Sequence, residues 1–253
     1  MNSKILNYDV VVAGGGIAGV SCAYNCAKFN LKTLLIEKEN YLGGDITGGL
    51  VVPVMKSESK NINCSFYNDL ISFAKEFNAQ HTYIDSNPGW FNPILLKCVL
   101  DDMLISKKCD LMFESRITSA NTSDKIINDI KIETNTLSLP VVSKYYVDAT
   151  GNASFAKILN CNFQNDNEIK QPPSLRFILS GVDVNTLAEF LEKIDSDKNI
   201  TTTNRVDSMT HLSTAFTWDK TKKWALEPYF EQACKDGVLK SFDLSYFQIF
   251  TIA

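Results

Sequence analysis

Near the amino terminus, the segment Gly14-Gly15-Gly16-Ile17-Ala18-Gly19 satisfies the pattern G-x-G-x-x-G. In this pattern the first glycine permits a tight turn, the second lets backbone approach a pyrophosphate, and the third allows a helix to pack closely on a strand. The helix that follows offers unpaired N–H groups and the positive end of its dipole to phosphates. Because glycine-rich turns are common, the meaning of this one depends on the elements around it.

The flanking residues predict a strand–turn–helix–strand unit. Tyr8–Ala13 (YDVVVA) is a short apolar, β-branched run that is typical of a buried parallel strand. Apolar residues then recur at helical spacing, at Ile17, Val20, Tyr24 and Ala27. Asn30 can end this helix in the left-handed conformation. Leu31–Glu37 predicts a second buried strand, joined to the first by a right-handed crossover.

An acidic residue closes this second strand. Glu37 lies eighteen residues after Gly19, where an acid that hydrogen-bonds a ribose is expected. Such charge-assisted hydrogen bonds are worth about 1.5–3 kcal/mol each. A carboxylate here also repels a 2′-phosphate, which disfavours NADP. The alternative is a structural glycine turn with a surface glutamate nearby.

A second glycine-rich segment follows the acid. It contains Gly43, Gly44, Gly48 and Gly49, with Asp45 and Thr47 between them. A segment of this kind suggests a chain that passes close to a large, flat ligand. FAD is long enough to run from Glu37 past Gly16 to this segment, whereas an NAD-dependent dehydrogenase needs only the first glycine pattern. A flexible surface loop is the alternative interpretation.

A third motif is Val147–Ala153 (VDATGNA). A strand that ends in small residues and glycine lets backbone approach a cofactor at the carboxyl edge of a parallel sheet. Taken alone, the same residues equally predict a helix that begins with a cap at Thr150 or Asn152.

The remaining residues predict the elements that position these motifs. In the first part of the chain we expect a helix with an apolar face over 66–77, a helix beginning at Asn92-Pro93, a strand at Asp110–Phe113, short antiparallel strands over 115–140, and a strand over Val141–Thr150. In the second part we expect a linker at Gln164–Pro173, a strand at Ser174–Asp183, a helix at Leu187–Ile194, a mobile polar loop over 196–210, a helix at Glu227–Lys235, and a strand at Leu244–Ile252.

Composition narrows the class of protein. The 253 residues carry a formal net charge of −4, which argues against a nucleic-acid-binding surface. The seven cysteines are irregularly spaced without a C-x-x-C pair, as in cytoplasmic proteins with reduced thiols, although Cys22 and Cys26 leave a metal or redox role open. Val10–Ala27 has no charge and is long enough for a membrane span. Its four glycines and its change of period favour strand and helix, so we expect a soluble protein.

Three segments, VVVAGGGIAGVSCAYNCAKFNLKTLLIEK, YLGGDITGGLV and VDATGNA, together resemble the FAD-dependent oxidoreductases with a two-part dinucleotide-binding fold. That group includes the flavoprotein subunits of fumarate reductase and succinate dehydrogenase. The most similar branch is that of the stand-alone oxidoreductases related to the flavoprotein subunit of heterodisulfide reductase, which SLRFILSGVD and SYFQIFTIA also resemble.

The resemblance implies an α/β fold. Residues 1–170 would form a Rossmann-like FAD-binding domain with an inserted β-meander at about 115–140, and residues 171–253 would form part of a second, α+β substrate domain. The candidate cofactor-binding residues would be Gly14, Gly16, Ile17 and Ala18 at the pyrophosphate, Glu37 at the adenosine ribose, Gly43, Gly44, Thr47 and Gly48 towards the ribityl chain and flavin, Ile117 at the adenine through its backbone, and Ala149, Thr150 and Gly151 along the cofactor, together with Gly19 and Lys38.

The resemblance also implies an activity. Bound FAD would exchange a hydride or electrons with a small-molecule substrate, and an iron–sulfur protein would be a possible electron-transfer partner. The sequence has no cluster motif and no metal-ligand pattern of its own. Catalytic residues stay unassigned: His81 is expected at the surface, His211 in a loop, and Arg176 either at a carboxylate substrate or in an interdomain ion pair.

The chain ends within an apolar run, IFTIA. From this we expect a truncated chain that lacks the family's C-terminal segment, which closes over the flavin; a docked terminal strand is the alternative. The missing segment leaves a non-catalytic flavin-binding module as one alternative to an FAD-dependent oxidoreductase, and the first glycine pattern leaves an NAD-dependent dehydrogenase as the other.

Overall fold

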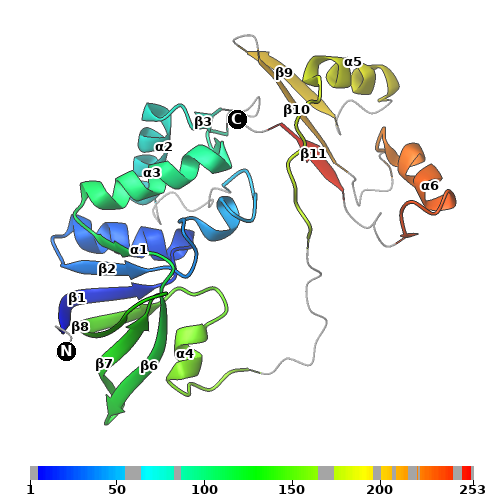
Figure 1. Ribbon diagram of the computed structural model, residues 1–253. Coiled ribbons are helices and arrows are strands. Elements are labelled where there is room, and N and C mark those ends of the chain that lie inside the picture. The colour runs from blue at the N-terminus through cyan, green and yellow to red at the C-terminus, as the bar shows by residue number, and fades with distance from the viewer. Residues whose placement is uncertain are drawn as a thin grey trace. The chain divides into compact units, whose positions relative to one another are not determined.

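The structure is a computed structural model, and it describes residues 5–54, 64–82, 87–164, 174–195, 201–206, 209–215, 221, 223–241 and 247–251. The chain divides into two compact units (Figure 1). The first unit is Met1–His81 with Pro88–Arg176, and the second is Thr82–Asn87 with Phe177–Ala253. Of the predicted linker, all but Gln164 lies outside the described residues.

The first unit is built on a six-stranded mixed sheet with the strand order β5-β2-β1-β8-β7-β6. The parallel strands are β1 (Leu6–Ala13), β2 (Thr33–Ile36), β5 (Asp110–Met112) and β8 (Ser138–Asp148). The antiparallel strands are β6 (Arg116–Ser123) and β7 (Ile126–Glu133). The predicted α/β class with a Rossmann-like parallel core is confirmed.

Strand β8 is longer than predicted. The sequence predicted separate strands before and after residue 140, but β8 continues unbroken from Ser138 to Asp148. Val141 pairs with Ile130 of β7 along one edge and with Leu6 of β1 along the other. A single strand thus ends the antiparallel meander and also forms the parallel sheet, because each strand of a sheet has two edges to pair.

Both faces of β2 and of the carboxyl half of β1 are buried, and successive side chains alternate between them. Val10 and Val12 pack beneath the helices α1 (Ile17–Lys28), α2 (Cys64–Glu76) and α3 (Pro93–Ser106), which lie over one face in Figure 1. Val11 and Ala13 pack on the other face, against side chains of the meander and of α4 (Ser154–Ile158). This burial explains the continuous apolar run of β1.

The ends of the helices follow the sequence signals. Asn30, just after α1, has a left-handed φ of 63°. The side chain of Asn92 caps α3 by accepting hydrogen bonds from the backbone N–H groups of Ile94 and Leu95. Two elements were not predicted: a short 3₁₀ turn, η1 (Gly44–Ile46), and a two-stranded sheet of β3 (Gln80–His81) and β4 (Trp90–Phe91), which are too short to show a period.

The second unit has a three-stranded antiparallel sheet with the order β11-β10-β9. Its elements are α5 (Val184–Ile194), β9 (Thr202–Val206), β10 (Met209–Ala215), α6 (Glu227–Lys235) and β11 (Gln248–Phe250). The two predicted helices are confirmed, and β11 lies within the predicted terminal strand.

Two predictions for this part of the chain are wrong. Ser174–Asp183 has β-strand composition, but the structure describes these residues and assigns no strand to them. Leu175 is 90% exposed there. Residues of strand-like composition form a strand only where the edge of a neighbouring strand is available to pair with their backbone. The polar segment 196–210 was predicted as a loop, yet its described part forms β9 and the start of β10. The threonines of β9 favour a strand, and the Thr203 hydroxyl bonds the Glu192 carboxylate of α5.

The uncharged run Val10–Ala27 is divided between β1, the glycine turn and α1. Within the described ranges, no helix combines the length and the apolar character that a membrane crossing requires.

Candidate functional site

The glycine turn joins the carboxyl end of β1 to α1, and two of its glycines leave no room for a side chain. Gly14 has a φ of +100°, and a Cβ there would lie 2.4 Å from the carbonyl oxygen of Ala149. A Cβ on Gly19 would lie 1.8 Å from the carbonyl oxygen of Gly14. The backbones of β1, β8 and α1 therefore meet at closest approach here, as the outer glycines of the pattern predicted.

Gly16, the middle glycine of the pattern, differs from Gly14 and Gly19 because it has open space beside it. A Cβ on Gly16 would meet no atom within 4 Å, so this side of the turn is open. Gly16 is the N-cap of α1 and has no side chain to bond the first amides of the helix. By position, the N–H groups of Ile17, Ala18 and Gly19 lack an intrahelical acceptor. Open space beside free helical amides is the geometry that accommodates a diphosphate.

Glu37 directs its carboxylate at the glycine turn. The side chain follows β2 and is 8% exposed. Its Oε2 accepts a hydrogen bond of 2.5 Å from the backbone N–H of Gly15, and its Oε1 accepts one of 2.9 Å from Glu39. Lys38, which was also expected to bind the cofactor, is largely exposed and forms an ion pair with Glu39 at 3.4 Å. The Glu37 carboxylate is therefore bonded to the glycine turn, whereas the Lys38 side chain lies at the surface.

Gly15 is a part of the site that the sequence interpretation missed. Its amide is the donor to Glu37, and a Cβ on it would lie 2.6 Å from the Leu42 side chain and 3.0 Å from Glu37 Oε2. The signal was the run of three consecutive glycines, of which G-x-G-x-x-G requires only two.

The two glycine-rich segments lie backbone to backbone. The N–H of Gly43 donates to the carbonyl oxygen of Gly15 at 2.8 Å, and Gly43 forms a parallel bridge with Gly16. A Cβ on Gly44 would lie 3.3 Å from Gly16 Cα. Segments that are distant in sequence, and that were both expected beside one ligand, thus meet at the same turn.

Thr47 and Gly48 make close contacts with other residues of this second glycine-rich segment. The Thr47 side chain is buried and its hydroxyl donates to the carbonyl oxygen of Leu42 at 2.5 Å. A Cβ on Gly48 would lie 2.1 Å from the hydroxyl of Tyr41. Their expected place towards the ribityl chain and flavin stays a prediction, with the Thr47 hydroxyl already bonded inside the loop.

The third motif reaches the same edge of the sheet. The N–H of Ala149 donates to the carbonyl oxygen of Ala13 at 2.8 Å, which extends the pairing of β8 with β1. Gly151 has a φ of +71°, and a Cβ on it would meet no atom within 4 Å. The Thr150 hydroxyl accepts a hydrogen bond from the N–H of Ser154 in α4 at 2.8 Å. The motif therefore caps a helix and also borders Gly14.

Ile117 lies in β6 with its side chain buried in the core of the meander face. Its side chain is therefore unavailable to a ligand, and the expected backbone contact with the adenine stays a prediction. Nearby, the N–H of Ser115 donates to the carbonyl oxygen of Glu37 at 3.0 Å, so the connection from β5 to β6 runs beside the acid.

Several other candidates lie outside this site. His211 was expected in a loop, but it is a buried residue of β10. His81, expected at the surface, is half-buried in β3. Arg176 was expected at a substrate or in an interdomain ion pair. Among the described residues, its Nη1 instead donates to the carbonyl oxygen of Leu50 at 3.1 Å, within the first unit.

The cysteine pair of α1 fits a core role. Burial, followed by the neighbouring Cys26 thiol, raises the pKa of Cys22 to about 11. A thiol that stays protonated at neutral pH is a poor nucleophile and a poor metal ligand. Within the described residues, no group of three or more His, Cys, Asp or Glu side chains could hold a metal ion.

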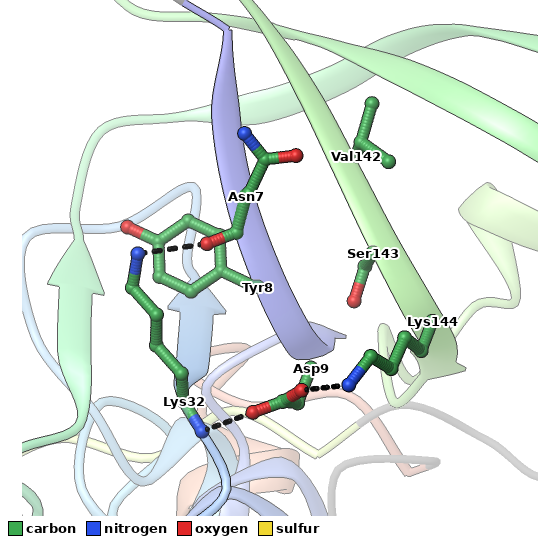
Figure 2. Close-up of a pocket in the computed structure, with 7 residues that line it drawn as sticks. All are labelled: Asn7, Tyr8, Asp9, Lys32, Val142, Ser143 and Lys144. Atoms are coloured by element: carbon green, nitrogen blue, oxygen red, sulfur yellow. Dashed lines mark hydrogen bonds and ion pairs between the residues drawn. The ribbon is translucent and has the colours of Figure 1, made fainter.

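A cavity of about 350 Å³ lies at the amino end of β1, the end opposite to Gly14. Figure 2 shows the Asp9 carboxylate bonded to Lys144 and to the backbone of Lys32, while Lys32 Nζ donates to the carbonyl oxygen of Asn7. The Asp9 carboxylate accepts hydrogen bonds from the backbone N–H of Lys32 at 2.9 Å and from Lys144 Nζ at 2.7 Å. Because these charges are already satisfied, we assign this cavity no part in the cofactor site.

The chain is similar to known oxidoreductases. A family model described as FAD dependent oxidoreductase matches residues 9–245. A D-amino acid dehydrogenase from Helicobacter pylori is 31% identical over 123 residues, an alignment that covers 37% of this chain and 30% of that protein. A digeranylgeranylglycerophospholipid reductase from Methanococcus vannielii is 38% identical over 68 residues, which cover 27% of this chain and 17% of that protein.

The chain thus matches less than a third of the length of these curated relatives. Among solved structures, the L-proline dehydrogenase from P. horikoshii has a TM-score of 0.47 and 13% sequence identity, covering 64% of this chain and 58% of that chain.

Proposed function

Because this chain belongs to the family of FAD dependent oxidoreductases, we propose that its first unit binds FAD and that the bound flavin takes part in electron transfer with a small-molecule substrate. In this proposal the open side of Gly16 and the first amides of α1 receive the diphosphate. Glu37 bonds the adenosine ribose, and the segment that begins at Gly43 borders the cofactor further along.

One observation carries the proposal: the Glu37 carboxylate bonds the amide of Gly15, directly beside the open face of Gly16. A sugar-binding acid and a diphosphate-binding turn are thereby held next to each other. An ordinary surface glutamate is exposed, whereas Glu37 is buried and bonded to a glycine amide next to the open face of the turn.

FAD, when bound, supplies the redox chemistry through its isoalloxazine ring. The protein groups described here hold the cofactor's nucleotide half. The buried side chains that pack α1 and α3 against the sheet keep these groups in place. Ile117 and the turn at Ala149–Gly151 offer backbone, so they add contacts without adding charge.

The finer assignment is also part of the proposal. The segments that resemble oxidoreductases related to the flavoprotein subunit of heterodisulfide reductase support a place in that branch, with an iron–sulfur protein as the electron-transfer partner. The irregularly spaced cysteines support a cytoplasmic location. The substrate itself is not specified by the groups described in the first unit.

The test begins with cofactor identity. The purified chain is expected to be yellow, to release FAD on denaturation, and after removal of the flavin to rebind FAD in preference to FMN and NAD, as measured by quenching of flavin fluorescence and by calorimetry. Preferential binding of NAD would overturn the FAD assignment. Bound FAD that neither dithionite nor small-molecule donors can reduce would leave a binding module and would overturn the redox role.

A further inference from the structure

Asp148, the last residue of β8, is the centre of a hydrogen-bond network that no cofactor contact requires. Its Oδ1 accepts hydrogen bonds from the backbone N–H of Thr150 at 3.0 Å and from the Thr150 hydroxyl at 2.6 Å. Its Oδ2 accepts one from the N–H of Ala156 at 2.7 Å. One carboxylate thus ties the end of the strand, the turn and the following helix together.

Helix α4, which follows the turn, depends on these hydrogen bonds for its stability. Helix α4 has five residues, and isolated helices of that length are unstable in water. Its N-cap, Ala153, has a left-handed φ of 53° and no side chain to bond the first amides. The hydroxyl of Thr150 and the carboxylate of Asp148 bond Ser154 and Ala156 instead. The groups that cap α4 therefore come from Asp148 and Thr150, which precede its N-cap residue in the chain.

The turn held in this way lies against the glycine turn. Gly14 has no Cβ, and its backbone lies so close to the carbonyl of Ala149 that a methyl group would not fit between them. The N–H of Ala149 donates to Ala13, the residue just before Gly14. A shift of the Ala149–Gly151 turn would therefore displace the first glycine of the pattern.

We propose that Asp148 is a positioning residue: it fixes the Ala149–Gly151 turn against Gly14 and so keeps the glycine turn in the geometry that binds FAD. This inference rests on the proposed function for its second half, whereas its first half concerns the protein alone. The Asp148 carboxylate bonds Thr150 and Ala156, so its effect on the glycine turn is indirect.

The test compares Asp148→Ala and the milder Asp148→Asn with Asp9→Ala. Asp9 is the control, since its carboxylate also accepts hydrogen bonds from the backbone and from a side chain but lies towards the other end of β1. Hydrogen exchange of the apo-protein is expected to show faster exchange of the amides of Thr150, Ser154 and Ala156 in the Asp148 variants only. FAD affinity of the folded variants is expected to fall by about tenfold for Asp148→Ala and to change by less than about twofold for Asp9→Ala.

The outcomes separate the inference from the function. Unchanged exchange at these amides in both Asp148 variants would overturn the positioning role. Faster exchange with wild-type FAD affinity would overturn the link between the turn and the cofactor. If the wild-type chain does not bind FAD, the proposed function fails, and the exchange data still decide whether Asp148 holds the turn. Should Asp148→Ala fail to fold, Asp148→Asn and Thr150→Val provide the same two measurements.

Discussion

The carboxylate of Glu37 accepts a hydrogen bond of 2.5 Å from the backbone amide of Gly15, so the end of the second strand is fastened to the glycine turn. The second carboxylate oxygen accepts the amide of Glu39. Both oxygens are oriented by backbone before any sugar hydroxyl could reach them. Preorganisation of this kind lowers the ordering cost of binding a ligand.

The first prediction concerns this acid. Glu37→Gln keeps the shape of the side chain but removes its charge and leaves one oxygen to serve two amides. Because charge-assisted hydrogen bonds contribute about 1.5–3 kcal/mol, we expect FAD affinity to fall at least about tenfold and the apo-protein to lose roughly 1–3 kcal/mol of unfolding free energy. Fluorescence titration with FAD and urea unfolding would measure the two effects.

The matched control for this variant is Glu39→Gln. Glu39 is two residues away, and its side chain is about half exposed in an ion pair with Lys38. Surface pairs of this kind contribute about 0–1 kcal/mol, so both measurements should stay close to wild type. Equal FAD affinity of Glu37→Gln and Glu39→Gln would contradict the ribose role.

The second prediction separates folding from binding within one turn. Gly19→Ala would place a methyl group 1.8 Å from the carbonyl oxygen of Gly14, between two pieces of backbone that cannot yield. We expect a loss of about 3 kcal/mol or more in unfolding free energy, at the upper end of overpacking effects, measured by urea denaturation.

Gly16→Ala is the complementary change. Gly16 has φ −62° and ψ 171°, which alanine adopts without strain, and its Cβ would meet no protein atom within 4 Å. The variant should unfold at nearly the wild-type urea concentration. Its methyl group would occupy the space that the diphosphate approaches, so FAD affinity should fall by about tenfold or more. Wild-type affinity in this variant would mean that the diphosphate lies elsewhere.

The parts of the site that the sequence predicted are those set by local chemistry. A strand, three glycines and a helix are contiguous, and the acid follows at the end of the next strand, so spacing alone places Glu37 beside the turn. The sequence analysis expected Gly16 and the segment from Gly43 along one long ligand, but it did not predict that the two backbones pair with each other, as they do.

The parts that the sequence did not predict depend on pairing between distant segments. Ser174–Asp183 and β9 show this in opposite directions, since the first has strand composition without an assigned strand and the second has polar composition within a sheet. Strand formation depends on a neighbouring edge, which composition does not reveal. The network of Asp148 was likewise hidden, because a carboxylate that caps a helix eight residues later follows no local capping rule.

The third prediction concerns pH and the contact between α1 and α2. Tyr24 is 2% exposed, and its hydroxyl donates to Asp69 at 3.0 Å. Burial, followed by the bond to Asp69, raises the pKa of Tyr24 to about 12. Because the folded state favours the neutral phenol, this contribution to stability is fully present below the unfolded pKa of about 10 and is lost as pH rises towards about 12.

Urea unfolding at a series of alkaline pH values would reveal this loss as a falling unfolding free energy. In Tyr24→Phe the slope between about pH 10 and 12 should flatten, and stability near neutral pH should drop by about 0.5–1.5 kcal/mol through the lost hydrogen bond. Tyr145→Phe is the control, since that side chain is 68% exposed and should leave the slope unchanged. If Tyr24→Phe keeps the wild-type slope, the alkaline sensitivity arises from another group, and the buried bond between α1 and α2 does not account for it.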